Sequence, residues 1–357
     1  MPLRRLTIRR FTAFGEATFD LAPGVNVLVG SNGAGKSHVL KLLYALHEAT
    51  RRAWEPAPHA PGFDALLQTI LAEVFLPDHL GRLVRRTQKG RKTADVSLSF
   101  GASEAHFSLT HHGNLTAATH GDPIDDDYRN TLPAVFLPTR EMLSIYPGFV
   151  SHWEERQTTW DRTYYDLCLL LGRSALRGPR DAARQRLLGP LEAALGGETD
   201  ASNGRFFVKL PDGDMEMPLL AEGMRKLAQL AWLILNGSLQ RKSLLLWDEP
   251  EASMNPEHAP LLAGTVLGLA REKVQVVLAT HDYVFASELS RQIEAERRVD
   301  PDAADRDAFF SIRRATGGER QVERTDTFAL LESNPILDAL AALHDRELLP
   351  AAGDAQP

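Results

Sequence analysis

An α/β fold with a mixed sheet core is predicted by three apolar runs, each of which ends in polar residues suited to a ligand site. The run 25–29 leads into a Gly-rich loop and then a helical pattern, 39–46. The run 244–247 ends in two adjacent carboxylates, and the run 276–279 ends in Thr-His. Short, continuous apolar runs are typical of parallel strands buried on both faces, so the three runs predict neighbouring strands of one sheet.

The Gly-rich loop has the spacing G-x-x-x-x-G-K-S, which is typical of a phosphate-binding loop between a strand and a helix. Its glycines let successive backbone N–H groups point at one phosphate, and the helix that starts there adds its positive dipole end. Lys36 can reach the β- and γ-phosphates, and the Ser37 hydroxyl can ligate Mg²⁺. The predicted nucleotide-binding residues are Gly30, Ser31, Asn32, Gly33, Ala34, Gly35, Lys36 and Ser37.

The carboxylates Asp248 and Glu249 follow the second apolar run directly. In nucleotide-hydrolysing proteins with such a loop, an acid at the end of a neighbouring strand holds the Mg²⁺ shell, which predicts Asp248 as a metal ligand beside Ser37. The next residue, Glu249, is then placed to take a proton from the attacking water.

Further motifs follow a fixed order along the chain. Leu220 to Arg225 reads Leu-Ala-Glu-Gly-Met-Arg, 251–256 reads Glu-Ala-Ser-Met-Asn-Pro, and the third apolar run ends at His281. This order resembles the ABC-type ATPases, and more narrowly the SMC, RecF and OLD-like "AAA family" proteins, which the segments 3–11 and 137–141 also resemble. The resemblance implies ATP as ligand and a P-loop NTPase fold of ABC-ATPase type. It also implies catalytic roles for Lys36, Glu249 and His281, the last contacting the γ-phosphate or orienting water.

The resemblance further implies a homodimer that encloses two ATP molecules, with Gly223 and Arg225 of one copy facing the nucleotide of the other. The family signature reads Leu-Ser-Gly-Gly-Gln, so Ala221 replaces its serine. Gly223 and the start of the following helix still offer a backbone anion site. Arg225 and Lys226 either supply compensating charge or begin a solvated helix. No glutamine occupies an obvious Q-loop position, so Arg140 or Glu141 either fills part of that role or only caps and pairs structurally.

The composition indicates a cytoplasmic protein with a substantial core. The chain has 357 residues, of which 43% are hydrophobic, and a single cysteine, Cys168, expected to be buried. No run approaches the roughly 18 apolar residues of a membrane helix, and the N-terminus has no signal-peptide pattern. The first 100 residues carry a net charge of +6, although the whole chain carries −7. The densest basic stretch predicts a hairpin that either lies along a nucleic-acid backbone or forms a solvated edge: Arg82, Arg85, Arg86, Lys89, Arg91 and Lys92.

Four regions are predicted. Residues 1–140 form a first ATPase lobe with the P-loop and the basic hairpin, and 141–240 form a helical lobe with the signature. Residues 241–348 return to the ATPase core, and 349–357 form a disordered tail. Helices are expected at 36–52, 66–76, 258–271 and 335–347, and 158–196 is expected to be mostly helical with breaks at Gly172 and at 178–179. Strands are expected within 82–118, 206–219 and 309–324. The acids Asp300, Asp302, Asp305 and Asp307 are expected to face water.

The predicted function is ATP hydrolysis whose nucleotide-dependent dimerisation controls a separately encoded effector, a nuclease being one candidate, in anti-phage defence. Sustained heptads are absent from the sequence, and the segment after His281 is too short for a fused nuclease domain. One alternative is a RecF-like repair ATPase that binds duplex DNA through the basic stretch. Another is a scaffold that binds ATP and turns it over slowly.

Overall fold

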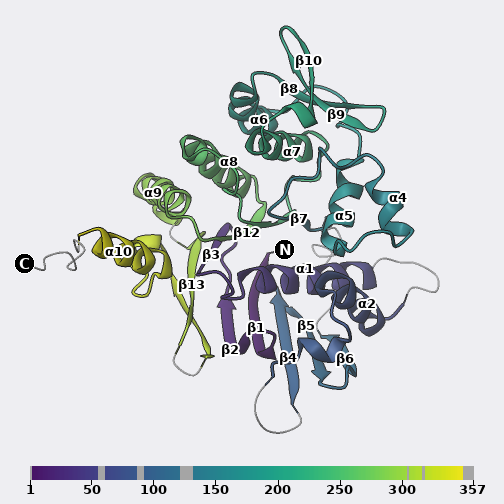
Figure 1. The fold of residues 1–357 in the computed structure, drawn as a ribbon, viewed down its shortest axis with the longest axis vertical. Coiled ribbons are helices and arrows are strands. Elements are labelled where there is room, and N and C mark those ends of the chain that lie inside the picture. The colour runs from purple at the N-terminus through teal and green to yellow at the C-terminus, as the bar shows by residue number, and fades with distance from the viewer. Residues whose placement is uncertain are drawn as a thin grey trace, which may run out of the picture.

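The computed structural model describes residues 2–54, 61–86, 92–120, 132–303, 305–315 and 318–348. A central sheet crosses the molecule, with helices α7, α8 and α9 on one side and α1 with a second sheet on the other (Figure 1). Two separate hydrophobic cores fill the spaces on either side of the central sheet. The architecture confirms the predicted mixed sheet core with an antiparallel β subdomain and a helical lobe.

The central sheet has six strands in the order β14-β13-β3-β12-β11-β7. All neighbours are parallel except β13 and β14, which form an antiparallel pair at one edge. Every residue of β3 and β12 is buried, as expected for parallel strands covered on both faces. The strands are β3 (Val25–Val29), β7 (Val135–Leu137), β11 (Leu244–Asp248), β12 (Gln275–Thr280), β13 (Ala308–Arg314) and β14 (Arg320–Thr325).

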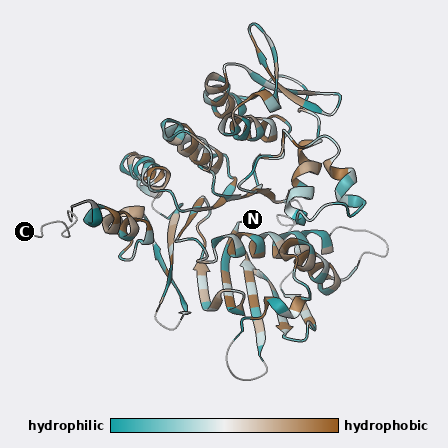
Figure 2. Ribbon diagram, viewed as in Figure 1, coloured by the Kyte–Doolittle hydropathy of each residue, from teal (hydrophilic) through white to brown (hydrophobic). Residues whose placement is uncertain are grey.

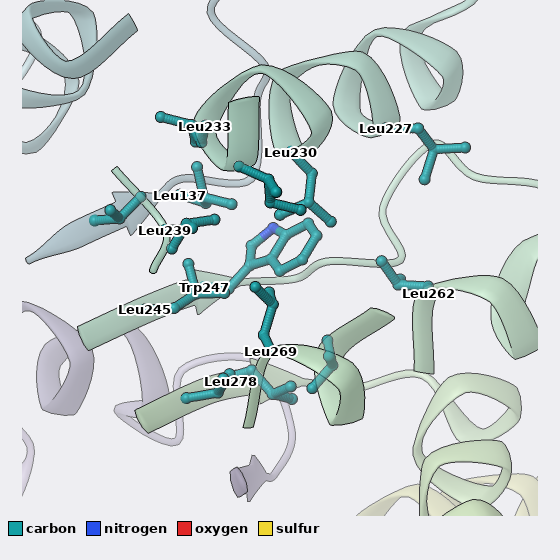
Figure 3. Packing of buried hydrophobic residues seen from close by; sticks show 14 of the residues in the cluster. Leu137, Leu227, Leu230, Leu233, Leu239, Leu245, Trp247, Leu262, Leu269 and Leu278 are labelled. Atoms are coloured by element: carbon teal, nitrogen blue, oxygen red, sulfur yellow. The ribbon is translucent and has the colours of Figure 1, made fainter. Parts of the chain in front are cut away.

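Successive residues of the central strands enter different cores, because side chains alternate across a sheet. Leu246 and Val277 pack on the side of α1 and the second sheet, whereas Leu245 and Trp247 pack on the side of the helices. Figure 3 shows the Trp247 indole between leucines of α7 (Glu222–Leu235) and α8 (Ala259–Arg271). The strand that carries the predicted acid pair is therefore held on both faces.

The second sheet is antiparallel, with the order β2-β1-β4-β5-β6. Its strands alternate between buried and exposed residues, visible as alternating hydrophobic and hydrophilic bands in Figure 2. The buried face packs against α1 and α2 in the same core. The elements are β1 (Leu3–Phe11), β2 (Phe14–Asp20), α1 (Lys36–Ala53), α2 (Phe63–Phe75), η1 (Leu80–Leu83), β4 (Thr93–Phe100), β5 (Ser103–Thr110) and β6 (Leu115–His120).

A helical region and a small three-stranded sheet lie at the far end of α7 (Figure 1). Cys168 is fully buried here, and burial raises the pKa of its thiol to about 12, so it serves packing as predicted. The elements are α4 (Phe149–Glu154), α5 (Arg162–Leu171), α6 (Ala182–Leu195), β8 (Glu198–Ser202), β9 (Arg205–Leu210), β10 (Gly213–Glu216) and η2 (Met217–Leu219).

The C-terminal part completes the helical side of the central sheet. Helices α8 and α9 pack against one another, and α10 lies beyond α9 at the edge of the molecule (Figure 1). The remaining elements are η3 (Pro256–His258), α9 (Tyr283–Val299), η4 (Pro301–Ala303), η6 (Phe328–Leu330) and α10 (Pro335–Leu348). None of the described helices is both long enough and apolar enough to cross a membrane.

The predicted basic hairpin lies partly outside the described residues, so it stays a prediction. Among the residues that the structure describes, Arg82 lies in η1, Val84 makes a single bridge to Phe11, and β4 pairs with β1 and β5. Lys89 and Arg91 lie outside the described residues, as does the tail 349–357.

Further differences from the expected elements are smaller. The helix α9 was not predicted, because its mixed face offers few apolar positions. Residues 217–219 continue as a 3₁₀ turn after β10 instead of as a strand, and β8 adds a third strand. Asp307 does not face water: it is 6% exposed and accepts a hydrogen bond of 2.7 Å from the backbone N of Val25.

Candidate nucleotide-binding site

The predicted phosphate-binding loop lies between the end of β3 and the start of α1. Gly33 and Gly35 have φ angles of 76° and 108°, in the left-handed region that favours glycine. A Cβ atom at Gly35 would lie 2.8 Å from the Phe14 ring, and one at Gly30 would lie 2.7 Å from the Ile312 carbonyl oxygen. Conformation therefore favours glycine at Gly33 and Gly35, and lack of space favours it at Gly30 and Gly35.

The Lys36 side chain folds back over this loop. Its Nζ atom donates to the backbone carbonyl of Gly30 at 2.6 Å and to that of Ser31 at 3.3 Å. Burial lowers the pKa of Lys36, and the nearby carboxylates of Glu249 and Asp248 oppose that shift. The ammonium group is thus held beside the loop, facing the two predicted acids.

The sheet brings the metal-binding pair together. Asp248 ends β11, which lies beside β12 and one strand away from β3, and it accepts a hydrogen bond from Ser37. Burial raises the pKa of Asp248, whereas the hydrogen bond from Ser37 lowers it. A hydroxyl and one carboxylate fit Mg²⁺, which takes few protein ligands and completes its shell with phosphates and water. No cluster of three or more His, Cys, Asp or Glu suited to a metal occurs elsewhere among the described residues.

Glu249 and His281 form a direct pair. The Nδ1 atom of His281 lies 2.9 Å from Oε1 of Glu249, although 31 intervening residues separate them in the sequence. Glu249 has a φ of 50°, and its backbone N donates to Ala279 at 2.9 Å. Non-glycine residues in this strained region cluster at functional sites, where the surrounding structure fixes them. Both side chains are partly exposed, at 26% for Glu249 and 46% for His281, so a water molecule can reach them.

Lys226 of α7 holds the segment that follows the acid pair, a role that neither reading of the sequence predicted. Lys226 is 3% exposed, and its Nζ donates to the carbonyl of Ala252 at 2.6 Å and to that of Glu249 at 3.4 Å. It is neither a solvated helix start nor an accessible compensating charge. Glu251, in the same segment, accepts from the Thr280 hydroxyl at 2.6 Å, and burial raises its pKa.

The signature residues Gly223 and Arg225 make contacts within their own chain. Gly223 is buried, and a Cβ atom there would lie 2.8 Å from the Ser253 carbonyl oxygen. Arg225 pairs with Glu141 at 2.6 Å and donates to the Leu220 carbonyl at 2.7 Å. Glu141 therefore has the structural pairing role that the sequence left open.

Arg320 is a further residue at the loop, and no feature of the sequence identifies it. From β14, its guanidinium donates to the carbonyl of Gly33 at 2.9 Å and to that of Ala34 at 3.0 Å. These contacts tie β14 to the phosphate-binding loop. Burial and the neighbouring Arg314 and Arg85 lower the pKa of Arg320.

Comparison with known proteins agrees with this geometry. A family model described as "AAA domain, putative AbiEii toxin, Type IV TA system" matches residues 123–287, and one described as "AAA domain" matches 5–53. The DNA replication and repair protein RecF of Salinibacter ruber is 41% identical over 69 residues, which is 18% of this chain and 17% of the relative. RecF of Edwardsiella ictaluri is 54% identical over 46 residues, 13% of each chain.

Two solved structures share the fold. An SMC head bound to the C-terminal winged-helix domain of ScpA has a TM-score of 0.59 at 13% identity, and the match covers 92% of this chain and 99% of that one. A Pyrococcus furiosus SMC head bound to the C-terminal domain of ScpA has a TM-score of 0.51 at 10% identity, covering 97% and 99%. The fold is that of ABC-type P-loop ATPases. In fold the chain is similar to SMC heads, and in short segments of its sequence it is similar to RecF.

The matches to RecF cover less than a fifth of each relative, so the whole-protein activities and partners of RecF do not follow from them. The structural likenesses are below 25% identity and describe the fold alone.

Proposed function

We propose that this protein binds ATP with Mg²⁺ and hydrolyses it to ADP and phosphate. The observation that carries the proposal is the Glu249–His281 pair, which lies at the strand ends beside Lys36 and the Ser37–Asp248 contact. A base, a water-orienting group, a phosphate-binding cation and a metal-binding pair are the parts that phosphoryl transfer to water requires.

In this mechanism the loop N–H groups and Lys36 hold the β- and γ-phosphates, and Ser37 and Asp248 hold the metal ion. When bound, Mg²⁺ neutralises charge that develops on the phosphate oxygens. Glu249 accepts the proton of the attacking water at its carboxylate. His281 fixes the Glu249 carboxylate through its Nδ1 atom, at 2.9 Å, and offers its other ring nitrogen to water or to the γ-phosphate.

We also propose nucleotide-dependent homodimerisation, which the resemblance of the signature segment implies. Gly223 of one copy would face the P-loop of the other, so that one γ-phosphate is contacted by both subunits. A ligand that binds only the closed dimer couples its own binding to dimer affinity, and hydrolysis removes that coupling. The Lys226 contacts with the carbonyls of Ala252 and Glu249 support this proposal, because they tie the start of α7 to the backbone of the proposed general base.

We assign residues 1–140 and 241–348 to the ATPase core and 141–240 to a helical lobe that carries the signature. The output of the cycle would be control of a separately encoded effector, with anti-phage defence as the setting. The match to the model that names AbiEii and the partner-bound SMC heads support an ATPase that works with another protein.

Dimerisation is tested by the mass of the Glu249→Gln protein in solution, measured by light scattering with and without Mg-ATP. We expect Mg-ATP to convert monomer to dimer, because the variant binds ATP without consuming it. The matched control Lys36→Ala is expected to stay monomeric. An unchanged mass of Glu249→Gln with saturating ATP would contradict closure by this chain alone.

Direct binding of duplex DNA is the second candidate, favoured by a basic surface beside the P-loop. Two adjoining depressions of about 430 and 460 Å³ share three arginines and add further cations: Arg82, Arg85, Arg86, Lys92, Arg314 and Arg320. Arg85 pairs with Glu319, and Arg320 donates to the loop carbonyls. A phosphate backbone bound at this surface would be linked to the nucleotide site through Arg320.

For this candidate we expect DNA to stimulate ATP turnover and to lose affinity steeply with salt. Charge reversal at Arg82 and Arg86 should lower the slope of log affinity against log salt by about one for each lost phosphate contact. Arg205→Glu, at the start of β9 in the small three-stranded sheet, is the matched control and should bind DNA as the parent does. Equal affinity and slope in all variants would exclude this surface as the DNA site.

A further inference from the structure

A cavity lies at the opposite end of the central strands from the phosphate-binding loop. It has a volume of about 510 Å³ and opens at the amino ends of the parallel strands, where Gly24, Leu244, Gln275 and Asp307 line it. The loop lies at the carboxyl end of β3, which at five residues is roughly 16 Å long. The cavity is therefore separate from the candidate nucleotide site.

The walls of the cavity are fixed by buried polar side chains. Gln275 is 5% exposed; it accepts from the backbone N of Leu3 at 2.8 Å and donates to the carbonyls of Leu3 and Ala22 at 2.9 and 2.8 Å. Asp307 binds the backbone N of Val25, and Gly24 N donates to the Arg306 carbonyl at 2.7 Å. These contacts join the N-terminal strand to the central sheet and keep the cavity preformed.

Two lysines at the rim have strained backbones. Lys242 has a φ of 73° and Lys273 a φ of 64°, and the backbone N of Lys242 donates to the Lys273 carbonyl at 3.1 Å. Both line the same cavity. These positive φ angles shape the turns that lead into β11 and β12, and the bond between the two lysines joins those turns at the rim.

The cavity is positively charged in a chain whose net charge is −7. Five cations line it, namely Arg241, Lys242, Arg271, Lys273 and Arg306, against two carboxylates, Glu296 and Asp307. Arg271 pairs with Glu296 and Arg306 pairs with Asp300, each at 2.9 Å, and Asp307 is buried. Arg241 and Lys273, both exposed at the rim, are therefore the cations that give the rim its positive charge. An anionic ligand is complementary to this rim.

The remaining lining is aliphatic: Pro2, Leu3, Pro23, Leu244, Leu267 and Ala270. Among the described residues that line the cavity, none is Phe, Tyr or Trp, so it offers no ring on which a nucleobase could stack. Aliphatic walls below a cationic rim fit a chain that carries both leucine-like side chains and carboxylates. We propose that this cavity binds an acidic segment of a partner protein, inserting one or two aliphatic side chains while its Asp or Glu residues pair with the rim. The proposal does not depend on ATP hydrolysis.

The test uses a fluorescein-labelled decapeptide of alternating glutamate and leucine and the full chain, with binding followed by fluorescence anisotropy. Two further peptides replace all glutamates with glutamine or all leucines with serine. We expect the first peptide to bind and each replacement to weaken binding by about tenfold or more, because the charged rim and the aliphatic walls both contribute.

Two protein variants locate the binding. Arg241→Glu combined with Lys273→Glu changes exposed side chains at the rim, and Ala270→Glu places a carboxylate on the wall. Both variants should lower the affinity for the glutamate–leucine peptide by about tenfold, and the exposed control Arg205→Glu should leave that affinity unchanged. The proposal is overturned if the serine peptide binds as well as the leucine peptide, since that is nonspecific attraction of polyanions. It is also overturned if neither rim nor wall variant changes binding, or if no peptide binds.

Discussion

Replacing Glu249 with glutamine is expected to lower ATP turnover by about 100-fold to 10,000-fold, the range that a positioned general base contributes. Glutamine keeps the size of the side chain and can still meet His281 Nδ1, now 2.9 Å from the carboxylate, but it cannot accept a proton from water. ATP affinity should persist, because Lys36, Ser37 and Asp248 are untouched. Phosphate release under multiple turnover and nucleotide binding by fluorescence measure the two quantities separately.

Glu257→Gln is the matched control for this prediction. Glu257 lies eight residues further on, its side chain is 67% exposed, and it contacts its neighbours Asn255 and His258. Its replacement should leave turnover unchanged, whereas Lys36→Ala should abolish both binding and turnover. If Glu249→Gln turned over like the parent while Lys36→Ala did not, the base would lie elsewhere. If the parent itself bound ATP without measurable turnover, the slow scaffold would be the correct alternative.

The second large effect concerns stability and centres on Glu48. This residue lies within α1 and is 1% exposed; its carboxylate accepts from the backbone N of Ala134 at 2.8 Å and pairs with Arg51 at 3.0 Å and Arg52 at 3.2 Å. Arg52 also pairs with Asp166 of α5, which joins the P-loop helix to the helical lobe. Glu48→Ala removes the shared carboxylate and leaves buried donors behind.

We expect Glu48→Ala to lower the free energy of unfolding by about 3–5 kcal/mol, the usual cost of breaking a buried ion pair from one side. That is a large part of the total stability of an ordinary domain. Urea denaturation followed by circular dichroism measures it. The exposed pair of Arg9 and Glu16 supplies the control, because Glu16→Ala should change stability by less than about 1 kcal/mol. A similar small loss for Glu48→Ala would contradict the network's role.

The same residue predicts a pH dependence. Burial by itself would raise the pKa of Glu48, but Arg51, His47 and Arg52 together lower it from 4.5 to about 2. Because the folded pKa lies below the unfolded one, the stabilisation is complete above about pH 4.5 and is lost as the pH falls towards 2. Glu48→Gln should therefore lose less stability than the parent over that interval.

Local sequence predicted the elements that carry the nucleotide site. The P-loop needs glycines with positive φ, a lysine and a serine at fixed spacing, and these requirements are local, so the motif identifies itself. The strands that end at Asp248 and His281 were equally predictable, because strands buried on both faces read as continuous apolar runs. The roles of the predicted site residues stay predictions until turnover and binding are measured.

Residues whose roles depend on distant partners could not be read in this way. Arg320 contacts the loop from 286 residues away, and Lys226 of α7 contacts Glu249 and Ala252, which lie 23 and 26 residues further on. Arg225 pairs with Glu141, and Asp307 with the start of β3. In sequence each resembles an ordinary surface charge, since nothing local distinguishes a buried ion pair from a solvated side chain.

The sequence by itself determined the class of site: where phosphate binds, which acids stand beside it and which strands carry them. These properties depend on backbone conformation and on hydrophobic periodicity over a few residues. Only the tertiary structure decided that Arg320 reaches the phosphate-binding loop, that Glu249 meets His281, and that a cavity lies at the amino ends of the parallel strands. Those outcomes depend on the pairing of strands far apart in the chain, which brings together side chains that no local pattern relates.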